Sequence, residues 1–234
     1  MNMGNIKIET LKLGGSNSYL LECRNGYILV DTGMKGAGKK LSEKLNEMEL
    51  KPKAIKMILL THSHYDHVQG LEEIKQLTHA PVAIHKDELA MFGRESLMNN
   101  ESSFIFRLII KIFGGITPDT DEKAIKTDIL ITDDMDLDNY GVDAKIVHTP
   151  GHSPGSVCIV TGDGQCICGD TLFDMFPGTH YPIIVYNRIK LAETYRKLDS
   201  MNPAVYYPGH GKPITREKFK SKIMNRDKYF RTGG

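Results

Sequence analysis

The amino-acid sequence predicts an α+β protein folded as a four-layer αβ/βα sandwich. Short apolar runs bounded by turn residues alternate with segments of helical spacing, and this alternation occurs in two successive halves of the chain. Strands on the inside and helices on the outside would give two sheets packed face to face, each covered on its outer side. A length of 234 residues fits one domain, 1–234, with a large core.

The first half is expected to contain five strands and two helices. The turn at Asn25-Gly26 favours a hairpin between two of the strands. Helical spacing of Leu41, Leu45 and Met48 indicates a helix that Pro52 closes. The expected strands are Ile6–Leu13, Ser18–Cys23, Tyr27–Asp31, Ile55–Leu60 and Pro81–His85, and the expected helices are Ala37–Leu50 and Val68–Leu77.

The second half repeats this plan after a helical insertion. The turn Gly162-Asp163-Gly164 predicts another hairpin. The expected strands are Ile129–Thr132, Ala144–His148, Val157–Thr161, Cys166–Gly169 and Val205–Tyr207, and the expected helices are Asn187–Met201 and Thr215–Phe230.

The insertion spans about residues 87–121 and is expected to influence substrate choice. Its part Ser103–Gly115 is apolar almost all round, with Arg107 and Lys111 forming a narrow charged stripe. A helix this apolar has to be covered. Packing on the domain, a homodimer interface through 103–115 and a lid over an apolar pocket are the alternatives, and contact with a membrane surface is the weakest of them.

Bulk composition agrees with a soluble protein of the cytoplasm, and a small molecule is the expected partner. Lysine and arginine total 30 against 29 aspartate and glutamate, so no nucleic-acid partner is expected. Met1–Leu13 lacks the pattern of a secretion signal, and the longest apolar stretch, Phe104–Phe113, is too short to span a membrane. The spacing of the four cysteines indicates neither a disulfide framework nor a zinc ribbon.

The most informative segment follows the apolar run Ile55–Leu60. It reads Thr61-His62-Ser63-His64-Tyr65-Asp66-His67, which places four potential metal ligands within six positions. Imidazole nitrogens and a carboxylate oxygen suit zinc, iron or manganese. So many polar groups at a strand end are costly unless a metal compensates for the crowding.

Three further candidate ligands, His152, Asp170 and His210, occur later in the chain. Each follows a strand-like run and has glycine beside it, which lets the backbone and a ligand approach closely. We expect the four strand ends to converge on one edge of the sandwich. The sequence therefore predicts one metal centre.

This ligand pattern resembles that of the metallo-β-lactamase superfamily over nearly the whole chain. The resemblance implies the metallo-β-lactamase-like fold and two divalent metal ions, with zinc expected and iron or manganese as alternatives. It also implies a role for each residue: His62, His64 and His152 as ligands of the first metal, Asp66, His67 and His210 as ligands of the second, Asp170 as the bridge, and Asp31 as a partner of a ligand.

The implied chemistry is hydrolysis of a small ester, thioester or lactone by a hydroxide that bridges the metals. Asp66 is the expected catalytic residue, because it would bind the second metal and orient the hydroxide. The residue that protonates the leaving group is not readable, and Tyr181 and His180 are candidates only.

The sequence departs from four known subfamilies, and each departure argues against the activity of that subfamily. Metallo-β-lactamases carry cysteine at the place of Asp170, and flavodiiron proteins carry glutamate at the place of His64. Acyl-homoserine lactonases have tyrosine where this chain has Phe173, and glyoxalase II has a helical domain where only 24 residues follow His210.

Two alternatives stay open. One is a mononuclear iron dioxygenase of the same fold, with His62, His152 and Asp170 as its ligands. The other is a phosphodiesterase similar to RNase Z, favoured only by the basic residues of the C-terminal stretch.

Overall fold

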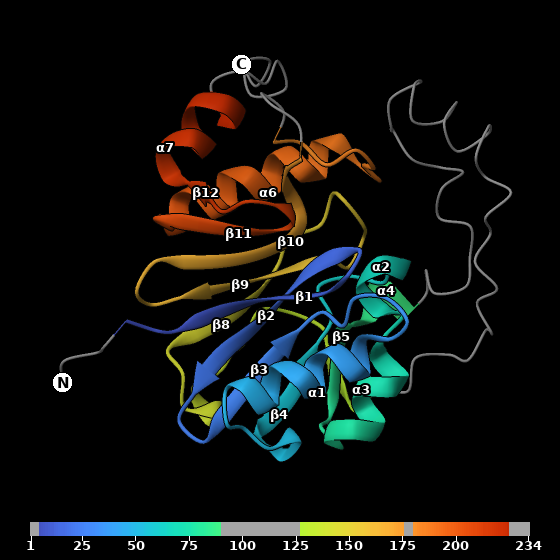
Figure 1. The fold of residues 1–234 in the computed structure, drawn as a ribbon. Coiled ribbons are helices and arrows are strands. Elements are labelled where there is room, and N and C mark those ends of the chain that lie inside the picture. Colours follow the sequence, from blue (N-terminus) through green and yellow to red (C-terminus); the bar gives the residue numbers. More distant parts are fainter. Residues whose placement is uncertain (1–4, 90–126, 176–179, 225–234) are drawn as a thin grey trace, which may run out of the picture.

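The computed structural model describes residues 5–89, 127–175 and 180–224, and it shows two sheets facing each other with helices on their outer sides (Figure 1). Within these residues, each sheet has six strands. This arrangement confirms the predicted α+β sandwich. The part Ser103–Gly115 of the insertion, with its lid and homodimer alternatives, lies outside the described residues.

The first sheet has the strand order β1-β2-β3-β4-β5-β6. Its first three strands pair antiparallel, and the strands from β3 to β6 pair parallel. The strands are β1 (Ile8–Gly14), β2 (Ser16–Cys23), β3 (Gly26–Val30), β4 (Ile55–Leu59), β5 (Val82–His85) and β6 (Ile129–Ile131), and the helical segments are α1 (Ala37–Glu47), η1 (Pro52–Ala54), α2 (Tyr65–Val68), α3 (Leu71–Thr78) and α4 (Lys86–Leu89).

The second sheet has the order β12-β11-β10-β9-β8-β7. Of the pairs among these described strands, β10 with β11 is parallel and the others are antiparallel. Its strands are β7 (Met135–Asp136), β8 (Ala144–His148), β9 (Val157–Thr161), β10 (Gln165–Asp174), β11 (Val205–Gly211) and β12 (Ile214–Thr215), and its helical segments are η3 (Asp138–Tyr140), α6 (Arg188–Met201), α7 (Arg216–Phe219) and the π-helical turn η4 (Lys220–Met224).

Three apolar layers hold the sandwich together. Leu41 and Ile74 bring α1 and α3 onto the outer face of the first sheet. The strands of both sheets contribute to the layer between them, where Val30 and Ile159 are fully buried. Tyr195 of α6 lies in the third layer, outside the second sheet. Each layer removes apolar surface from water, which is the main force that favours the packed sheets.

Several element boundaries differ from the sequence prediction. The helix expected at Val68–Leu77 is two helices, α2 and α3, because Gly70 lies between them in close contact with the 32–37 segment, where a Cβ would overlap the Thr32 carbonyl. Strand β10 continues beyond Gly169, and β11 continues beyond Tyr207. The helix expected at Thr215–Phe230 begins as α7 and continues as the wider π-helical turn η4, and residues 225–230 lie outside the described part.

Parallel pairing explains how the sandwich gathers its polar loops. The carboxyl ends of β3, β4 and β5 lie at one edge of the first sheet, and β10 and β11 run side by side in the second. Within the three described stretches, no helix has both the length and the apolarity needed to cross a bilayer.

Candidate metal centre

The segment after β4 carries the first set of polar side chains. His62 and Thr61 are buried directly after the strand, and α2 then begins at Tyr65 and points His67 into the interior. The backbone carbonyl of Asp66 accepts a hydrogen bond from Ser16 Oγ at 2.8 Å, and the carbonyl of His67 accepts one from Thr32 Oγ1 at 2.9 Å. These contacts fasten the segment to the first sheet.

The second sheet supplies Asp170 and His210 from neighbouring strands. Both residues lie within β10 and β11 rather than in the loops that the sequence predicted. Phe173 pairs with His210 across these strands, after a shift in register. A Cβ at position 209 would overlap the Asp170 carboxylate, so the glycine there allows the two strands to approach at the centre.

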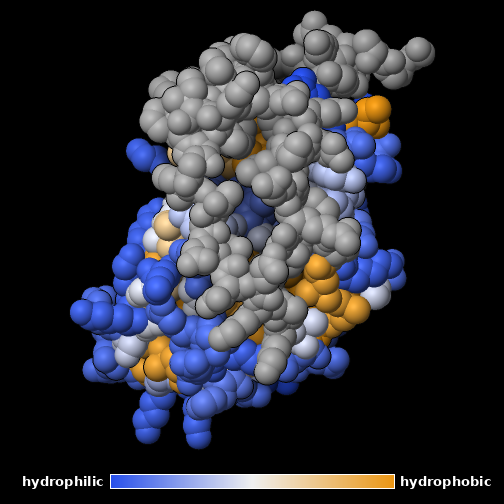
Figure 2. Space-filling model, turned by 90° about the vertical axis from the view of Figure 1, so that its right-hand side faces the viewer, coloured by the Kyte–Doolittle hydropathy of each residue, from blue (hydrophilic) through white to orange (hydrophobic). Residues whose placement is uncertain are grey.

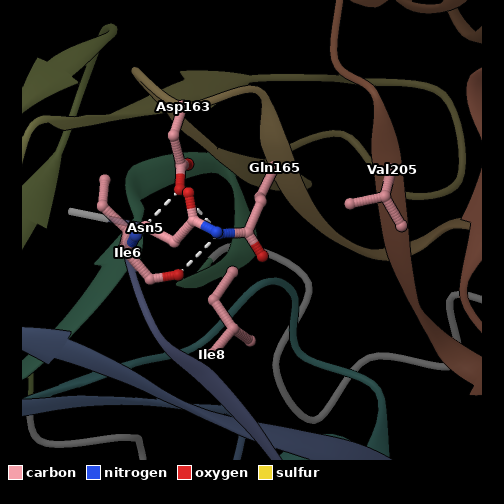
Figure 3. Close-up of a pocket in the computed structure, with 6 residues that line it drawn as sticks. All are labelled: Asn5, Ile6, Ile8, Asp163, Gln165 and Val205. Carbon is pink, nitrogen blue, oxygen red and sulfur yellow. Dashed lines mark hydrogen bonds between the residues drawn. The ribbon is translucent and has the colours of Figure 1, made fainter. Parts of the chain in front are cut away.

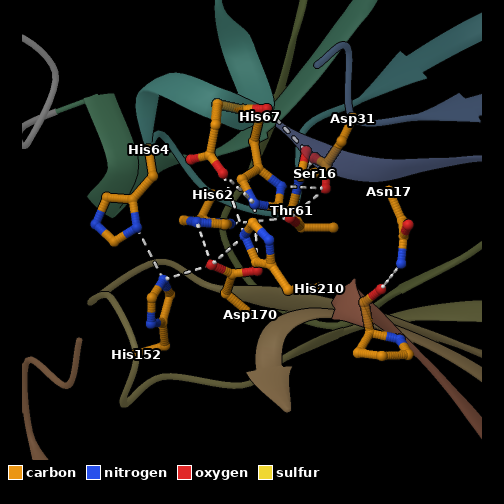
Figure 4. Close-up of polar contacts among 12 residues, drawn as sticks. Ser16, Asn17, Asp31, Thr61, His62, His64, His67, His152, Asp170 and His210 are labelled. Carbon is orange, nitrogen blue, oxygen red and sulfur yellow. Dashed lines mark hydrogen bonds and ion pairs between the residues drawn. The ribbon is translucent and has the colours of Figure 1, made fainter. Parts of the chain in front are cut away.

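One group of donors consists of His62, His64 and His152 beside Asp170 (Figure 4). His152 Nε2 lies 2.9 Å from His64 Nδ1. Asp170 Oδ2 lies 3.5 Å from His152 Nε2 and 3.7 Å from His62 Nε2. The donor atoms come from three separate segments and face one point, a geometry that suits one metal ion.

The other group consists of Asp66, His67 and His210. His210 Nε2 lies 3.1 Å from Asp66 Oδ2, and His67 Nε2 lies 3.9 Å from the same oxygen. Asp170 Oδ1 is 3.2 Å from His67 Nε2, and its Oδ2 is 3.5 Å from His210 Nε2. The Asp170 carboxylate therefore lies between the two groups, where a bridging ligand would have to be.

Hydrogen bonds behind the histidines set which nitrogen faces the centre. Asp31 Oδ2 accepts from His67 Nδ1 at 2.8 Å, so Nε2 of His67 carries the free lone pair. Thr61 Oγ1 donates to Asp31 at 2.8 Å and therefore accepts from His62 Nδ1 at 3.0 Å. In the same way, the Ile184 carbonyl accepts from His152 Nδ1 at 2.8 Å. Thr61 has this role without any signal in the sequence beyond its place before His62.

The backbone at Asp31 is held in an uncommon conformation. Its φ of 60° lies in the left-handed region, which costs free energy for a residue other than glycine. The carboxylate is 1% exposed and accepts from Thr61 N as well as from Thr61 Oγ1 and His67. The placement agrees with the expectation of a carboxylate that supports a ligand.

Three buried atoms at the centre, His62 Nε2, His67 Nε2 and Asp170 Oδ1, make no well-aligned hydrogen bond among the described residues, although the last two lie 3.2 Å apart as an ion pair. Buried polar atoms are nearly always paired, because leaving one unpaired is costly. All three atoms face the same space in Figure 4. Lone pairs directed together in this way fit a bound metal ion, and the residues present therefore suit the metal centre that the sequence predicted.

The electrostatics of the two groups differ. Burial lowers the pKa of His62 and His64, and it lowers the pKa of His152 to about 3. Burial also opposes charge on His210, but its contacts with Asp170 and Asp66 outweigh that effect and raise its pKa to about 9. The first group is thus a set of neutral imidazoles, and the second is a set of imidazoles paired with carboxylates.

His180 and Tyr181, the two candidates for protonating the leaving group, have contacts with residues outside the two donor groups. His180 is buried behind β10, with Nδ1 2.9 Å from Asp174 Oδ1. The Tyr181 hydroxyl donates to the Ile223 carbonyl at 3.4 Å, and its ring packs against Tyr195. Phe173 instead forms a wall of the site, because its ring centroid lies 4.9 Å from that of His210.

Two other features of the molecule are less suited to chemistry. His85, Asp87 and His148 lie close together, but the two imidazoles are stacked within 10° of parallel at 4.1 Å. Parallel rings do not direct their lone pairs at one ion. The hollow in Figure 3 is lined by residues that include Gln165 and Val205, the first residues of β10 and β11, and so it lies at the strand ends opposite Asp170 and His210.

Among the coloured residues on the face shown in Figure 2, hydrophilic ones predominate, and hydrophobic ones lie among them. The large exposed hydrophobic side chains include Tyr65, between two donors of the centre, and Tyr186, whose backbone N–H donates to the His152 carbonyl at 3.1 Å. Exposed aromatic side chains therefore lie in the segment of His64 and Asp66 and beside the segment of His152.

Comparison with known proteins agrees with this geometry. The family model of the metallo-beta-lactamase superfamily matches residues 11–210. The probable metallo-hydrolase MJ0888 of Methanocaldococcus jannaschii is 31% identical over 210 residues, which cover 86% of this chain and 92% of that protein.

The probable metallo-hydrolase YqgX of Bacillus subtilis is 31% identical over 159 residues, which cover 68% of this chain and 66% of that protein. The chain thus spans just under two thirds of YqgX. A crystal structure of TTHA1623 in a di-iron-bound form matches with a TM-score of 0.66 and 25% identity, covering 93% of this chain and 98% of the other. This chain belongs to the metallo-beta-lactamase superfamily.

Proposed function

We propose that the protein is a dinuclear metal-dependent hydrolase that cleaves a small ester, thioester or lactone. The observation that carries the proposal is the position of Asp170, whose carboxylate lies beside both groups of donors. Its Oδ2 is 3.5–3.7 Å from His62, His152 and His210, and its Oδ1 is 3.2 Å from His67. The hydrolase class is supported by relatives named probable metallo-hydrolases, and the count of two metals by the di-iron form of TTHA1623.

Each donor has a defined place in this proposal. His62, His64 and His152 would hold one ion, and Asp66, His67 and His210 would hold the other. Asp170 would bridge them. The donors are nitrogen and oxygen atoms with no thiolate among them, a set that binds zinc, iron or manganese. We expect zinc, and a metal analysis decides the identity.

Two bound cations would activate water as the nucleophile and polarise the scissile carbonyl. Asp66 is the proposed catalytic residue, because its side chain is 23% exposed while Asp170 is 4% exposed. That exposure lets Asp66 reach the entering water and orient it. Contacts with His210 and His67 outweigh burial and lower the pKa of Asp66, which keeps it an acceptor.

The apolar side chains at the site favour a substrate with an apolar portion. Phe173 contributes a ring next to His210 and has no hydroxyl with which to protonate a leaving group. A good leaving group, such as a thiolate or an activated alkoxide, needs less help from an acid. Thioesters and activated esters are therefore the first substrates to test.

The first experiment measures metal per chain by elemental analysis of protein expressed without added metal. About two equivalents are expected in the wild type and about one in His210→Asn. The matched control is His79→Asn, which removes an exposed imidazole at the end of α3 and should retain two. Two equivalents together with turnover of a thioester, ester or lactone would support the proposal.

A different result would redirect the assignment. One equivalent of iron, with oxygen consumption on a persulfide, would replace the proposal with the mononuclear dioxygenase. Cleavage of a phosphodiester but no carboxylic ester would favour the RNase Z-like alternative.

A further inference from the structure

A buried carboxylate outside the two donor groups joins the segments that carry the first group. Glu88 lies in α4, directly after β5, and is 0% exposed. Its Oε2 accepts hydrogen bonds from Ser63 N at 2.8 Å and Ser63 Oγ at 2.7 Å. Its Oε1 accepts from Ser153 Oγ at 2.6 Å and Gly155 N at 2.7 Å.

The partners of Glu88 lie next to or near the histidines of the first group in the chain. Ser63 lies between His62 and His64, and Ser153 directly follows His152. The two segments come from different sheets and meet at the centre, where His64 Nδ1 and His152 Nε2 are 2.9 Å apart. One side chain therefore holds both segments that supply the first group of donors.

The hydrogen bonding of Glu88 is complete and specific. Each carboxylate oxygen accepts one backbone N–H and one hydroxyl, and all four donors are neutral. The negative charge is therefore not cancelled by these partners, and in a buried setting it favours a cation nearby.

The second segment is shaped to receive this carboxylate. A Cβ at Gly155 would lie 2.8 Å from Glu88 N and 2.9 Å from Glu88 Cγ, closer than real side chains come. Ser153 Oγ also lies 2.6 Å from Ser156 Oγ, which fixes the hydroxyl that faces Glu88. The fit involves the backbone as well as side chains, so the spacing of the two segments depends on it.

We propose that Glu88 is a positioning residue that sets the affinity of the first metal position. It does so by fixing the distance between the His62–His64 segment and His152 and by adding negative charge behind them. This inference rests on the proposed metal centre. Glu88 touches neither Asp66 nor His210 in any described contact, so the second position should depend on it much less.

Glu88→Gln tests the proposal with almost no change in shape. Each oxygen of Glu88 faces a backbone N–H, which cannot accept a hydrogen bond. Whichever way the glutamine amide turns, its NH₂ group therefore opposes the N–H of Ser63 or of Gly155. One of the two segments must move away.

The chain offers a matched control in Glu73→Gln. Glu73 Oε1 accepts from Gly36 N at 2.8 Å, and its Oε2 accepts from Gly38 N at 3.0 Å. It thus also links two segments through backbone N–H groups, here the start of α1 and the helix α3. The same chemical change is made in a carboxylate that contacts neither donor group.

The measurement is titration of each metal-free protein with cobalt(II), followed by its absorption spectrum and by competition with a chelator. Glu88→Gln should weaken one of the two sites by about 10- to 100-fold and change the spectrum of that site. The other site, and both sites of Glu73→Gln, should match the wild type. Thermal melting of the metal-free proteins reports separately on stability.

The outcomes separate this inference from the proposed function. If both sites of Glu88→Gln bind cobalt(II) with the affinities of the wild type, as both sites of Glu73→Gln should, the role of Glu88 is overturned. The metal centre itself would still stand. A wild type that binds no cobalt(II) would overturn both. If Glu88→Gln does not fold, Ser153→Ala removes one of the four hydrogen bonds, and an unchanged first site in that variant would overturn the inference.

Discussion

Replacing Asp31 with asparagine should weaken the second metal position more than the first. Asparagine has the same shape and tolerates the left-handed backbone found at this residue. However, its amide can accept at only one of its two ends. With NH₂ toward the Thr61 N–H, two donors would face each other, and a backbone N–H has no alternative state. The amide therefore turns its oxygen toward Thr61 N and its NH₂ toward His67.

His67 must then change tautomer. Its Nδ1 now accepts from the introduced amide, so the proton moves to Nε2, the atom that faces Asp170 at 3.2 Å. A protonated Nε2 cannot bind a metal. The expected loss of affinity at this position is about 10- to 100-fold, or roughly 1.4–2.7 kcal/mol. Thr61 Oγ1 also loses its acceptor at this oxygen of residue 31, but it keeps a lone pair for His62 Nδ1, so the first group should be affected less than the second.

Competition between the protein and a chromogenic chelator measures both affinities in one titration. Asp163→Asn is a suitable control, because Asp163 accepts from Ile6 N at 2.8 Å at the opposite end of the sheet. An unchanged second affinity in Asp31→Asn would refute the tautomer argument. Equal weakening of both sites would show that Asp31 supports the fold of the centre as a whole.

Three further predictions concern the centre and its surroundings. Asp170→Ala should weaken both metals and abolish turnover, and two retained metals with full activity would rule out a bridging role. Free metal about a hundredfold above each Kd adds about 2.7 kcal/mol per ion, so chelation should lower the melting temperature by roughly 10–20 °C, whereas an unchanged melt would contradict tight binding. Lys75 and the Val82 N–H lower the pKa of Asp128. Asp128 is exposed, so its ion pair with Lys75 contributes only about 0.2–1 kcal/mol to stability. This stabilisation is full above the pKa that Asp128 has in the unfolded chain, and it is lost as the pH falls through its lower pKa in the folded protein. The melting temperatures of Asp128→Asn and the wild type should therefore converge at low pH.

The sequence contained enough information to predict the fold and the convergence of the donors. Apolar runs mark the strands, and a polar residue directly after such a run, as at His62, has to lie at the edge of a sheet. The same reasoning placed Asp170 and His210 after their strands, whereas both lie inside β10 and β11. The apolar pattern stops at Gly169, but backbone pairing continues because β11 lies alongside.

The residues that support the donors could not be predicted in this way. Glu88 looks like any acidic residue at the start of a short helix, and Thr61 looks like the end of a strand. Their roles depend on which segments the two sheets bring together, since the partners of Glu88 are 25 and 65 residues away in the chain. Local patterns carry no information on contacts of that kind.

Glu88 and Asp31 together suggest a division of labour at the centre. Each is a buried carboxylate outside the two donor groups. Glu88 binds the segments of the first group, whereas Asp31 binds His67 of the second group directly and reaches His62 only through Thr61. Their hydrogen-bond partners do not overlap, since Glu88 binds Ser63, Ser153 and Gly155 while Asp31 binds Thr61 and His67. Independent supports predict additive effects on metal affinity. If the double variant Asp31→Asn/Glu88→Gln instead lost far more than the sum of its parts, the two positions would be coupled through Asp170, the one side chain that both donor groups share.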